Sequence, residues 1–184
     1  MENDELVEIE RVRRGADLLY DETTVARTVR EMAIQVTHDL AETNPLVICV
    51  MNGGLMLTGW LTPYLNFPLQ LDYAHVTRYR GGTQGGSLQW IAKPRALLED
   101  RTLLLVDDIF DQGVTLGCLV DACRQLGARD IKTAVLVQKL HDRVATDMRP
   151  DFVGLTVPDR YVFGCGMDYR HYLRNLPAIY AVHD

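Results

Sequence analysis

The stretch from residue 103 to residue 116 constrains the fold of this chain more than any other segment. It reads Leu-Leu-Leu-Val-Asp-Asp-Ile-Phe-Asp-Gln-Gly-Val-Thr-Leu, so four apolar residues run directly into an acidic pair, Asp107 and Asp108. An uninterrupted apolar run of this kind is typical of a strand that is buried on both faces of a sheet. Apolar side chains then recur at helical spacing up to Gly127, which predicts a tight turn followed by a helix.

The turn after the acidic pair has the composition of an anion-binding site. It contains a third carboxylate, Asp111, followed by Gly113 and Thr115. Backbone N–H groups at the start of a helix lack partners within the helix and bind phosphate, and the Thr115 hydroxyl can add a further hydrogen bond. Three carboxylates beside such a site suit a substrate that carries phosphate and hydroxyl groups, with a divalent metal ion between them.

Strands and helices are expected to alternate along the rest of the chain. This alternation predicts an α/β fold with a mainly parallel central sheet flanked by helices, in which ligands bind beyond the carboxyl ends of the strands. No repeat, low-complexity tract or linker interrupts the chain, so residues 1–184 are expected to form a single domain. The expected elements are an amphipathic helix at 24–43, strands at 46–51, 72–79, 131–138 and 178–182, and a helix after Gly54 that ends or kinks at Pro63; residues 80–86 are expected to be irregular.

Composition excludes several classes of function. A net charge of −6 and a pI of about 5.3 argue against a nucleic-acid partner. No apolar stretch approaches 18 residues and the acidic N-terminus cannot be a signal peptide, so we expect no membrane partner and a cytoplasmic location. The four cysteines show no CxxC spacing and are expected to be reduced core residues: Cys49, Cys118, Cys123 and Cys165.

The segment 103–116 resembles the signature of the phosphoribosyltransferases, the enzymes that use 5-phosphoribosyl 1-pyrophosphate (PRPP). The resemblance implies that Asp107 and Asp108 hold the ribose hydroxyls and contribute to a metal site. It also implies that the following turn binds the 5′-phosphate of PRPP. The residues of this turn are Asp111, Gln112, Gly113, Val114 and Thr115.

A second ordered set of residues narrows the resemblance to the hypoxanthine-guanine phosphoribosyltransferases, over most of the chain from about residue 46 to the end. Lys139 closes a strand, Pro158-Asp-Arg-Tyr-Val-Phe-Gly164 follows, and Met167-Asp-Tyr169 precedes an arginine. The resemblance implies the type I phosphoribosyltransferase fold, with a small hood formed by the chain ends, and a homodimer or homotetramer. By the same resemblance, Lys139, Tyr161 and Val162 bind the purine, Asp168 helps to hold Mg²⁺, and Arg174 binds pyrophosphate.

The implied reaction gives these residues complementary tasks. A purine ring nitrogen attacks C1 of the ribose as pyrophosphate leaves, and Asp111 is positioned to accept the purine N7 proton. Mg²⁺ and Arg174 stabilise the departing pyrophosphate. A lysine at the purine 6-oxo group favours hypoxanthine or guanine, because the exocyclic amine of adenine would meet Lys139 donor to donor.

The chain departs from the family pattern at three places. Asn52 precedes Gly53 and Gly54 where better-known members have lysine, and the peptide bond Met51–Asn52 is a candidate for the unusual cis bond of that loop. We expect Asn52, Gly53 and Arg78 to lie at the pyrophosphate, with Arg78 supplying the cation that Asn52 lacks. Gln112 and Val114 replace the familiar residues of the phosphate turn, which a turn binding through backbone N–H groups tolerates.

The glycine-rich stretch 80–86 is expected to belong to a lid that shelters the reacting centre from water. By resemblance, Tyr79 would cover the bound substrates. Trp90 lies just past this stretch and would report its closure through tryptophan emission.

Two other classes of protein share part of this sequence pattern. A phosphoribosyltransferase-like regulator that senses nucleotides and binds RNA would share the PRPP signature but would need a basic face. A receiver-like signalling domain would carry its acidic pair near the chain start, whereas Asp107 and Asp108 lie past the midpoint. The sequence leaves open the ranking of hypoxanthine, guanine and xanthine, the choice of dimer or tetramer, and any regulatory role.

Overall fold

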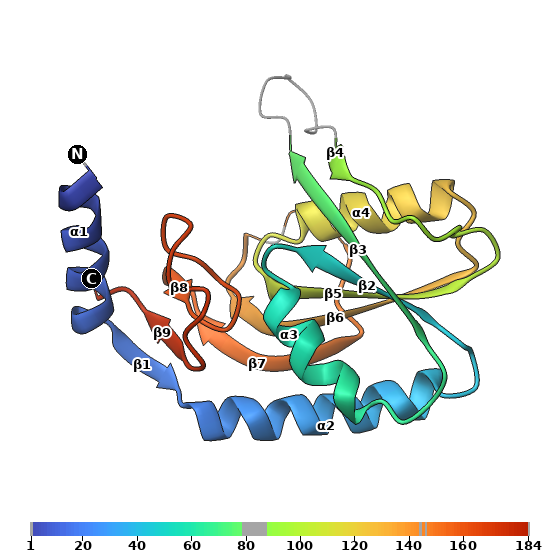
Figure 1. Ribbon diagram of the computed structural model, residues 1–184, viewed down its shortest axis with the longest axis horizontal. Helices are drawn as coiled ribbons and strands as arrows, with labels where there is room; N and C mark the ends of the chain where they lie inside the picture. Colours follow the sequence, from blue (N-terminus) through green and yellow to red (C-terminus); the bar gives the residue numbers. More distant parts are fainter. Residues whose placement is uncertain (1, 79–87, 144, 146, 184) are drawn as a thin grey trace.

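The computed structural model describes residues 2–78, 88–143, 145 and 147–183, and it contains two sheets of unequal size (Figure 1). The larger sheet has six strands in the order β4-β3-β2-β5-β6-β7. All neighbouring strands in it are parallel except β3 and β4, which are antiparallel. The strands are β2 (Leu46–Met51), β3 (Gln70–Arg78), β4 (Leu88–Ala92), β5 (Thr102–Phe110), β6 (Asp130–Leu140) and β7 (Phe152–Pro158).

Helices cover both faces of this sheet, which explains the apolar run from Leu103 to Val106 in its central strand β5 (Figure 1). Leu104 and Val106 of β5 pack in one core cluster with α2 (Glu22–Leu40) and α3 (Leu55–Leu61). Leu103 and Leu105 pack in a second cluster with α4 (Val114–Gln125). Alternate side chains of a strand point to opposite faces, so both faces of β5 need apolar residues. The expected mainly parallel α/β fold is therefore confirmed.

The smaller sheet joins the two ends of the chain and forms the expected hood. Its order is β1-β9-β8, and both of its pairs are antiparallel. The strands are β1 (Asp17–Tyr20), β8 (Val162–Phe163) and β9 (Ile179–Ala181), and α1 (Glu2–Gly15) lies beside them (Figure 1). Arg160 ties this sheet together by donating to Asp17 at 2.6 Å, and the Tyr20 hydroxyl donates to the Thr156 carbonyl of β7 at 2.7 Å.

Several element boundaries differ from the sequence expectations for local reasons. Strand β5 continues to Phe110, so Asp107 and Asp108 lie within the strand rather than after it, because the backbone ladder with β6 runs on beneath the polar side chains. Helix α2 begins at Glu22, where Asp21 caps it by accepting from the Thr24 N–H at 2.8 Å. Pro63 lies in a short 3₁₀ turn, η1 (Thr62–Tyr64), directly after α3, so the expectation that it ends this helix is confirmed.

Other elements were not anticipated from the sequence, namely α1, β1, β4, β7 and β8. The stretch 80–86 and Tyr79 lie outside the described residues. Among the helices that the structure describes, none combines the length and the apolar character needed to cross a membrane. Cys49, Cys123 and Cys165 are buried as expected and Cys118 is half-buried, and all four have free thiols.

Candidate active site

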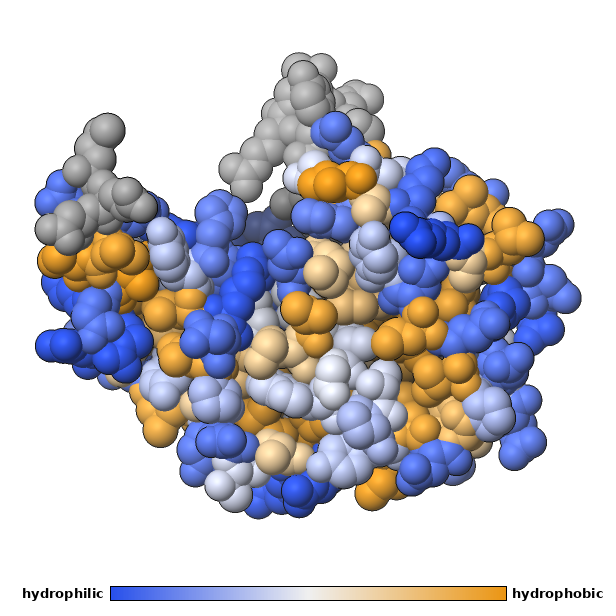
Figure 2. All heavy atoms as spheres, in the orientation of Figure 1, coloured by the Kyte–Doolittle hydropathy of each residue, from blue (hydrophilic) through white to orange (hydrophobic). Residues whose placement is uncertain are grey.

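Two adjoining cavities lie where the carboxyl ends of β5 and β6 approach the hood. One, of about 330 Å³, is lined by residues 107–116. The other, of about 180 Å³, lies between the same acids and the hood. Figure 2 shows the surface hollowed between the hood and the body of the molecule, with hydrophilic residues along the visible part of the hollow. The smaller cavity is lined by Asp108, Ile109, Asp111, Lys139, Tyr161, Val162, Met167 and Asp168.

The larger cavity faces the start of helix α4. Gly113 is the N-cap residue and has a φ of 77°, a left-handed conformation that glycine adopts without the cost paid by other residues. No described side chain caps this helix, so the N–H groups of its first turn remain open to a ligand. Gln112, Val114 and Thr115 line the same cavity and are half-buried. This arrangement fits the predicted phosphate-binding turn.

The acidic pair lies at the junction of the two cavities. Asp107 accepts a hydrogen bond from the Asp108 N–H at 3.0 Å. Burial raises the pKa of Asp107 well above its usual range, and the charge of Asp108 raises it further. Burial also raises the pKa of Asp108, against the effect of Arg174. Clustered carboxylate oxygens are the ligands that Mg²⁺ prefers, and a bound cation would relieve their repulsion, so these residues fit a metal site.

Arg174 links the hood to the acidic pair. Its guanidinium group is 2.5 Å from Asp168 Oδ1 and 3.8 Å from Asp108 Oδ2, and it donates to the Gly166 carbonyl at 2.6 Å. Asp168 also accepts from the His171 N–H at 2.7 Å. The predicted metal ligand Asp168 and the predicted pyrophosphate ligand Arg174 therefore lie together, beside Asp108.

A glycine loop after β2 closes tightly over the acidic pair. The peptide bond Met51–Asn52 is cis, as the sequence resemblance suggested. A Cβ atom at Gly53 would overlap the carboxylate of Asp108, and a Cβ at Gly54 would overlap the Val106 carbonyl oxygen. Only glycine permits this approach. Asn52 itself is exposed at the edge of the loop.

The smaller cavity brings together the predicted purine-binding residues. The Lys139 side chain is only 13% exposed, and Val162 is buried. Tyr161 is 52% exposed, so one face of its ring is open to a ligand in the cavity. Its ring meets Tyr169 edge-on, with centroids 5.5 Å apart and an interplanar angle of 77°. Burial raises the pKa of Tyr161.

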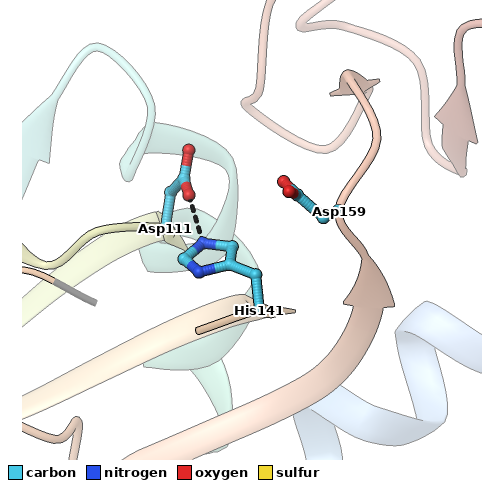
Figure 3. Close-up of side chains that lie close together, drawn as sticks. All are labelled: Asp111, His141 and Asp159. Atoms are coloured by element: carbon cyan, nitrogen blue, oxygen red, sulfur yellow. Dashed lines mark hydrogen bonds and ion pairs between the residues drawn. The ribbon is translucent and has the colours of Figure 1, made fainter. Parts of the chain in front are cut away.

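Asp111 lines both cavities, and its carboxylate contacts two side chains, Lys139 and His141. Lys139 Nζ is 3.5 Å from Asp111 Oδ2, and His141 Nε2 is 2.5 Å from Asp111 Oδ1 (Figure 3). Sequence reasoning missed His141. The signal that could have found it is its spacing, because residues two apart at the end of a strand lie on the same side, and His141 is two residues after Lys139.

Asn52 lines neither of the two cavities, and two other predicted site residues cannot be placed from the described part of the structure. Arg78 ends β3, but its side chain is outside the described part of the structure, as is the whole of Tyr79. The other predicted residues lie around the two cavities: Gly53, Asp107, Asp108, Asp111, Gln112, Gly113, Val114, Thr115, Lys139, Tyr161, Val162, Asp168 and Arg174.

The candidate site lies at the carboxyl end of the central strands, where proteins with an open parallel α/β sheet bind their ligands. The family described as "Phosphoribosyl transferase domain" matches residues 15–170. The chain belongs to this phosphoribosyltransferase family and is an enzyme of that type.

Relatives with known names place the chain more narrowly within the family. It is 35% identical to the hypoxanthine-guanine phosphoribosyltransferase of Bacillus subtilis, over 88% of this chain and 90% of the relative. It is 31% identical to the hypoxanthine-guanine-xanthine phosphoribosyltransferase of Tritrichomonas foetus, over 88% of both chains. The crystal structure of a hypoxanthine phosphoribosyltransferase from Staphylococcus aureus superposes with a TM-score of 0.86 at 26% identity, covering 93% of this chain and 94% of that one.

Proposed function

We propose that this chain transfers the phosphoribosyl group of PRPP to hypoxanthine or guanine, forming IMP or GMP and releasing pyrophosphate. The observation that carries the proposal is the cavity in which Lys139, Asp111 and Tyr161 meet, directly beside the phosphate turn. The names of the relatives support the same reaction. Among the residues that the structure describes, no comparable grouping supports the receiver-like alternative.

The phosphate turn and the acidic pair would orient PRPP. The open N–H groups at the start of α4 bind the 5′-phosphate, and the Thr115 hydroxyl adds a hydrogen bond. Asp107 and Asp108 accept hydrogen bonds from the ribose hydroxyls. The Gly53 main chain, Asn52 and Arg78 complete the pyrophosphate side. Holding C1 of the ribose close to the purine in this way converts a bimolecular encounter into a positioned reaction.

Asp107, Asp108 and Asp168 would hold Mg²⁺. When bound, this ion would neutralise charge on the pyrophosphate as it leaves. Arg174 would add a second positive charge from the hood side, because it already spans Asp168 and Asp108. Together these groups favour departure of the pyrophosphate while the ribose becomes positively charged.

Base selection would rest on the smaller cavity. Lys139 has only donors, so it rewards a 6-oxo group and meets the 6-amino group of adenine unfavourably. Tyr161 would stack on the purine, and the main chain of Val162 would read its Watson–Crick edge. Asp111 accepts the N7 proton as the opposite ring nitrogen becomes the nucleophile.

The remaining expectations concern the whole chain. We propose that residues 1–184 act as one phosphoribosyltransferase domain, since cavity-lining residues come from both sheets. A homodimer or homotetramer is the expected assembly, which light scattering after size exclusion would measure. The Tyr79 lid also stays a prediction, to be tested by the response of Trp90 emission to Mg²⁺, PRPP and an unreactive purine analogue.

An assay of pyrophosphate release tests the proposal. Protein, Mg²⁺ and PRPP are incubated separately with hypoxanthine, guanine, xanthine and adenine. The proposal predicts turnover with hypoxanthine or guanine and little with adenine. A nucleotide-sensing regulator would instead bind PRPP or nucleotides and release no pyrophosphate with any of the four bases.

A further inference from the structure

His141 is a nearly buried imidazole in contact with the proposed base, and no step of the reaction described above uses it. It follows directly after β6, and its side chain is 4% exposed, whereas that of Asp111 is 40% exposed. Figure 3 shows the imidazole directed toward the Asp111 carboxylate from the neighbouring strand end. Burying a polar ring at this point requires partners for both of its nitrogens.

The hydrogen bonds of the ring assign its tautomer. The backbone N–H of Arg143 donates to His141 Nδ1 at 3.0 Å, so Nδ1 carries no proton. In the neutral ring the proton then resides on Nε2, which donates to Asp111 Oδ1 at 2.5 Å. A ring in this state cannot accept a proton from Asp111, because its only basic lone pair is on Nδ1 and already accepts from the Arg143 N–H.

Because of the hydrogen bond to His141, the two carboxylate oxygens of Asp111 have different surroundings. Oδ1 is occupied by His141, whereas Oδ2 lies 3.5 Å from Lys139 Nζ, a residue of the purine cavity. The shorter of the two contacts is the one to His141, and 40% of the Asp111 side chain is exposed. We propose that His141 is a positioning residue that fixes the Asp111 carboxylate through Oδ1, so that Oδ2 accepts the purine N7 proton.

A metal site is the competing use of the same side chains. Ligand atoms of Asp111, His141 and Asp159 lie within 4.8 Å of one another. However, Arg143 is bound to Asp159 at 2.5 Å, and Lys139 lies beside Asp111, so both carboxylates already have cationic partners. A metal ion on Nε2 would require the ring proton on Nδ1, where it would face the Arg143 N–H, itself a donor. These charges favour the positioning role.

Two substitutions of His141 distinguish the role of its Nε2 atom from that of its Nδ1 atom. The amide of His141→Gln reaches about as far as Nε2 and can still donate to Asp111. The shorter amide of His141→Asn can replace Nδ1 toward Arg143 but falls short of Asp111. His38→Asn is a matched control, because His38 is 87% exposed near the end of α2 and away from both cavities.

Steady-state kinetics with hypoxanthine and PRPP give the first test, which rests on the proposed function. We expect His141→Asn to lower kcat roughly 10-fold or more, the usual scale for losing a group that orients a reactive residue, with the KM for PRPP nearly unchanged. His141→Gln should recover most of this loss, and His38→Asn should show none. In an Asp111→Asn background, His141→Asn should cost nothing further.

Three kinetic results would overturn the positioning role: wild-type kcat in His141→Asn, equal losses in the Asn and Gln variants, or an undiminished loss in the Asp111→Asn background. Tight stoichiometric binding of Zn²⁺ that His141→Asn abolishes would also overturn it, in favour of the metal site. Circular dichroism and thermal unfolding of each variant show whether a loss of kcat reflects unfolding instead.

A spectroscopic test does not depend on enzymatic activity. In protein labelled with ¹⁵N-histidine, the His141 ring, identified by its absence in His141→Gln, should show the tautomer protonated at Nε2. Its Nε2 signal should move in Asp111→Asn. A ring protonated at Nδ1 would contradict the inference. An inactive wild-type protein with the expected tautomer would contradict the proposed function while leaving the hydrogen bond established.

Discussion

At the scale of single residues, the environment of Asp111 predicts a specific loss on substitution. Asp111→Asn keeps the shape of the side chain and removes its ability to take a proton, so kcat should fall roughly 10²-fold or more. PRPP affinity should change much less, because the N–H groups of the phosphate turn remain. Single-turnover kinetics and equilibrium PRPP binding separate the two effects. Wild-type turnover with weakened PRPP binding would mean that Asp111 is a ligand and not the base.

Substitution of Asp107 should raise the stability of the ligand-free protein while it lowers activity. Its pKa is raised first by burial and then by the charge of Asp108. An acid with a higher pKa in the folded state binds more protons when folded, so it lowers stability as pH rises from its unfolded-state pKa toward its folded-state pKa. Asp107→Asn removes this cost and should raise the Tm of the ligand-free protein at pH 7.5. A gain of about 2–4 °C corresponds to ~1 kcal/mol in a domain of this length.

The gain should shrink at pH 5, where the wild-type carboxyl is closer to its protonated form. Activity with PRPP and Mg²⁺ should fall at both pH values, because the variant loses a carboxylate of the proposed Mg²⁺ site. Differential scanning calorimetry at the two pH values measures the first effect. A lower Tm at pH 7.5 would show that Asp107 stabilises the fold, contrary to the direction of its pKa shift.

At the scale of elements, two glycines in consecutive segments provide a matched pair. A Cβ at Gly53 would overlap the Asp108 carboxylate, whereas a Cβ at Gly59, within α3, would meet nothing within 4 Å. Alanine at Gly59 should stabilise the protein by up to ~1 kcal/mol, the difference in helix propensity. Alanine at Gly53 should destabilise it and weaken PRPP binding. Urea unfolding measures both, and equal effects of the two substitutions would contradict the described packing of the loop.

The elements that the sequence predicted are those with strong local patterns. The apolar run before Asp107 and the helical spacing after Gly113 each needed only a few residues to be recognised, and α4 ends at Gln125, just before Gly127 with its φ of 86°. Helix α1 was not predicted because its few apolar residues are scattered among charged ones; of these Ile9 is buried, whereas Leu6 and Val7 are exposed. Strand β8 has two residues, too few for any pattern.

The residues of the candidate site also differ in how far the sequence could predict them. Residues within one segment, such as the phosphate turn, could be predicted together because the backbone itself holds them together. The partnership of Arg174 with Asp108 depends on how the hood packs, which no spacing encodes. The bond between His141 and Asp111 joins the ends of two strands, and it required the register of β5 and β6, in which Phe110 pairs with Gln138.

At the scale of the whole molecule, the chain ends complete a site that the central sheet begins. The sheet supplies Asp107, Asp108 and Lys139, and the hood region supplies Tyr161 and Asp168. Arg174 of the hood region also lies 3.8 Å from Asp108 of the sheet, so the two parts are in contact beside the cavities. A purine in the smaller cavity would touch both parts, so base binding and the placement of the hood are expected to depend on each other.

The most direct test of this account is the ratio of kcat/KM for hypoxanthine to that for adenine, measured in wild type and in Lys139→Gln. A glutamine amide presents either a donor or an acceptor, so the ratio should fall, mainly through weaker use of hypoxanthine. Tyr161→Ala is the control, because stacking is largely indifferent to exocyclic groups and both bases should weaken alike. An unchanged ratio in Lys139→Gln would contradict the assignment of this cavity as the site that selects 6-oxopurines.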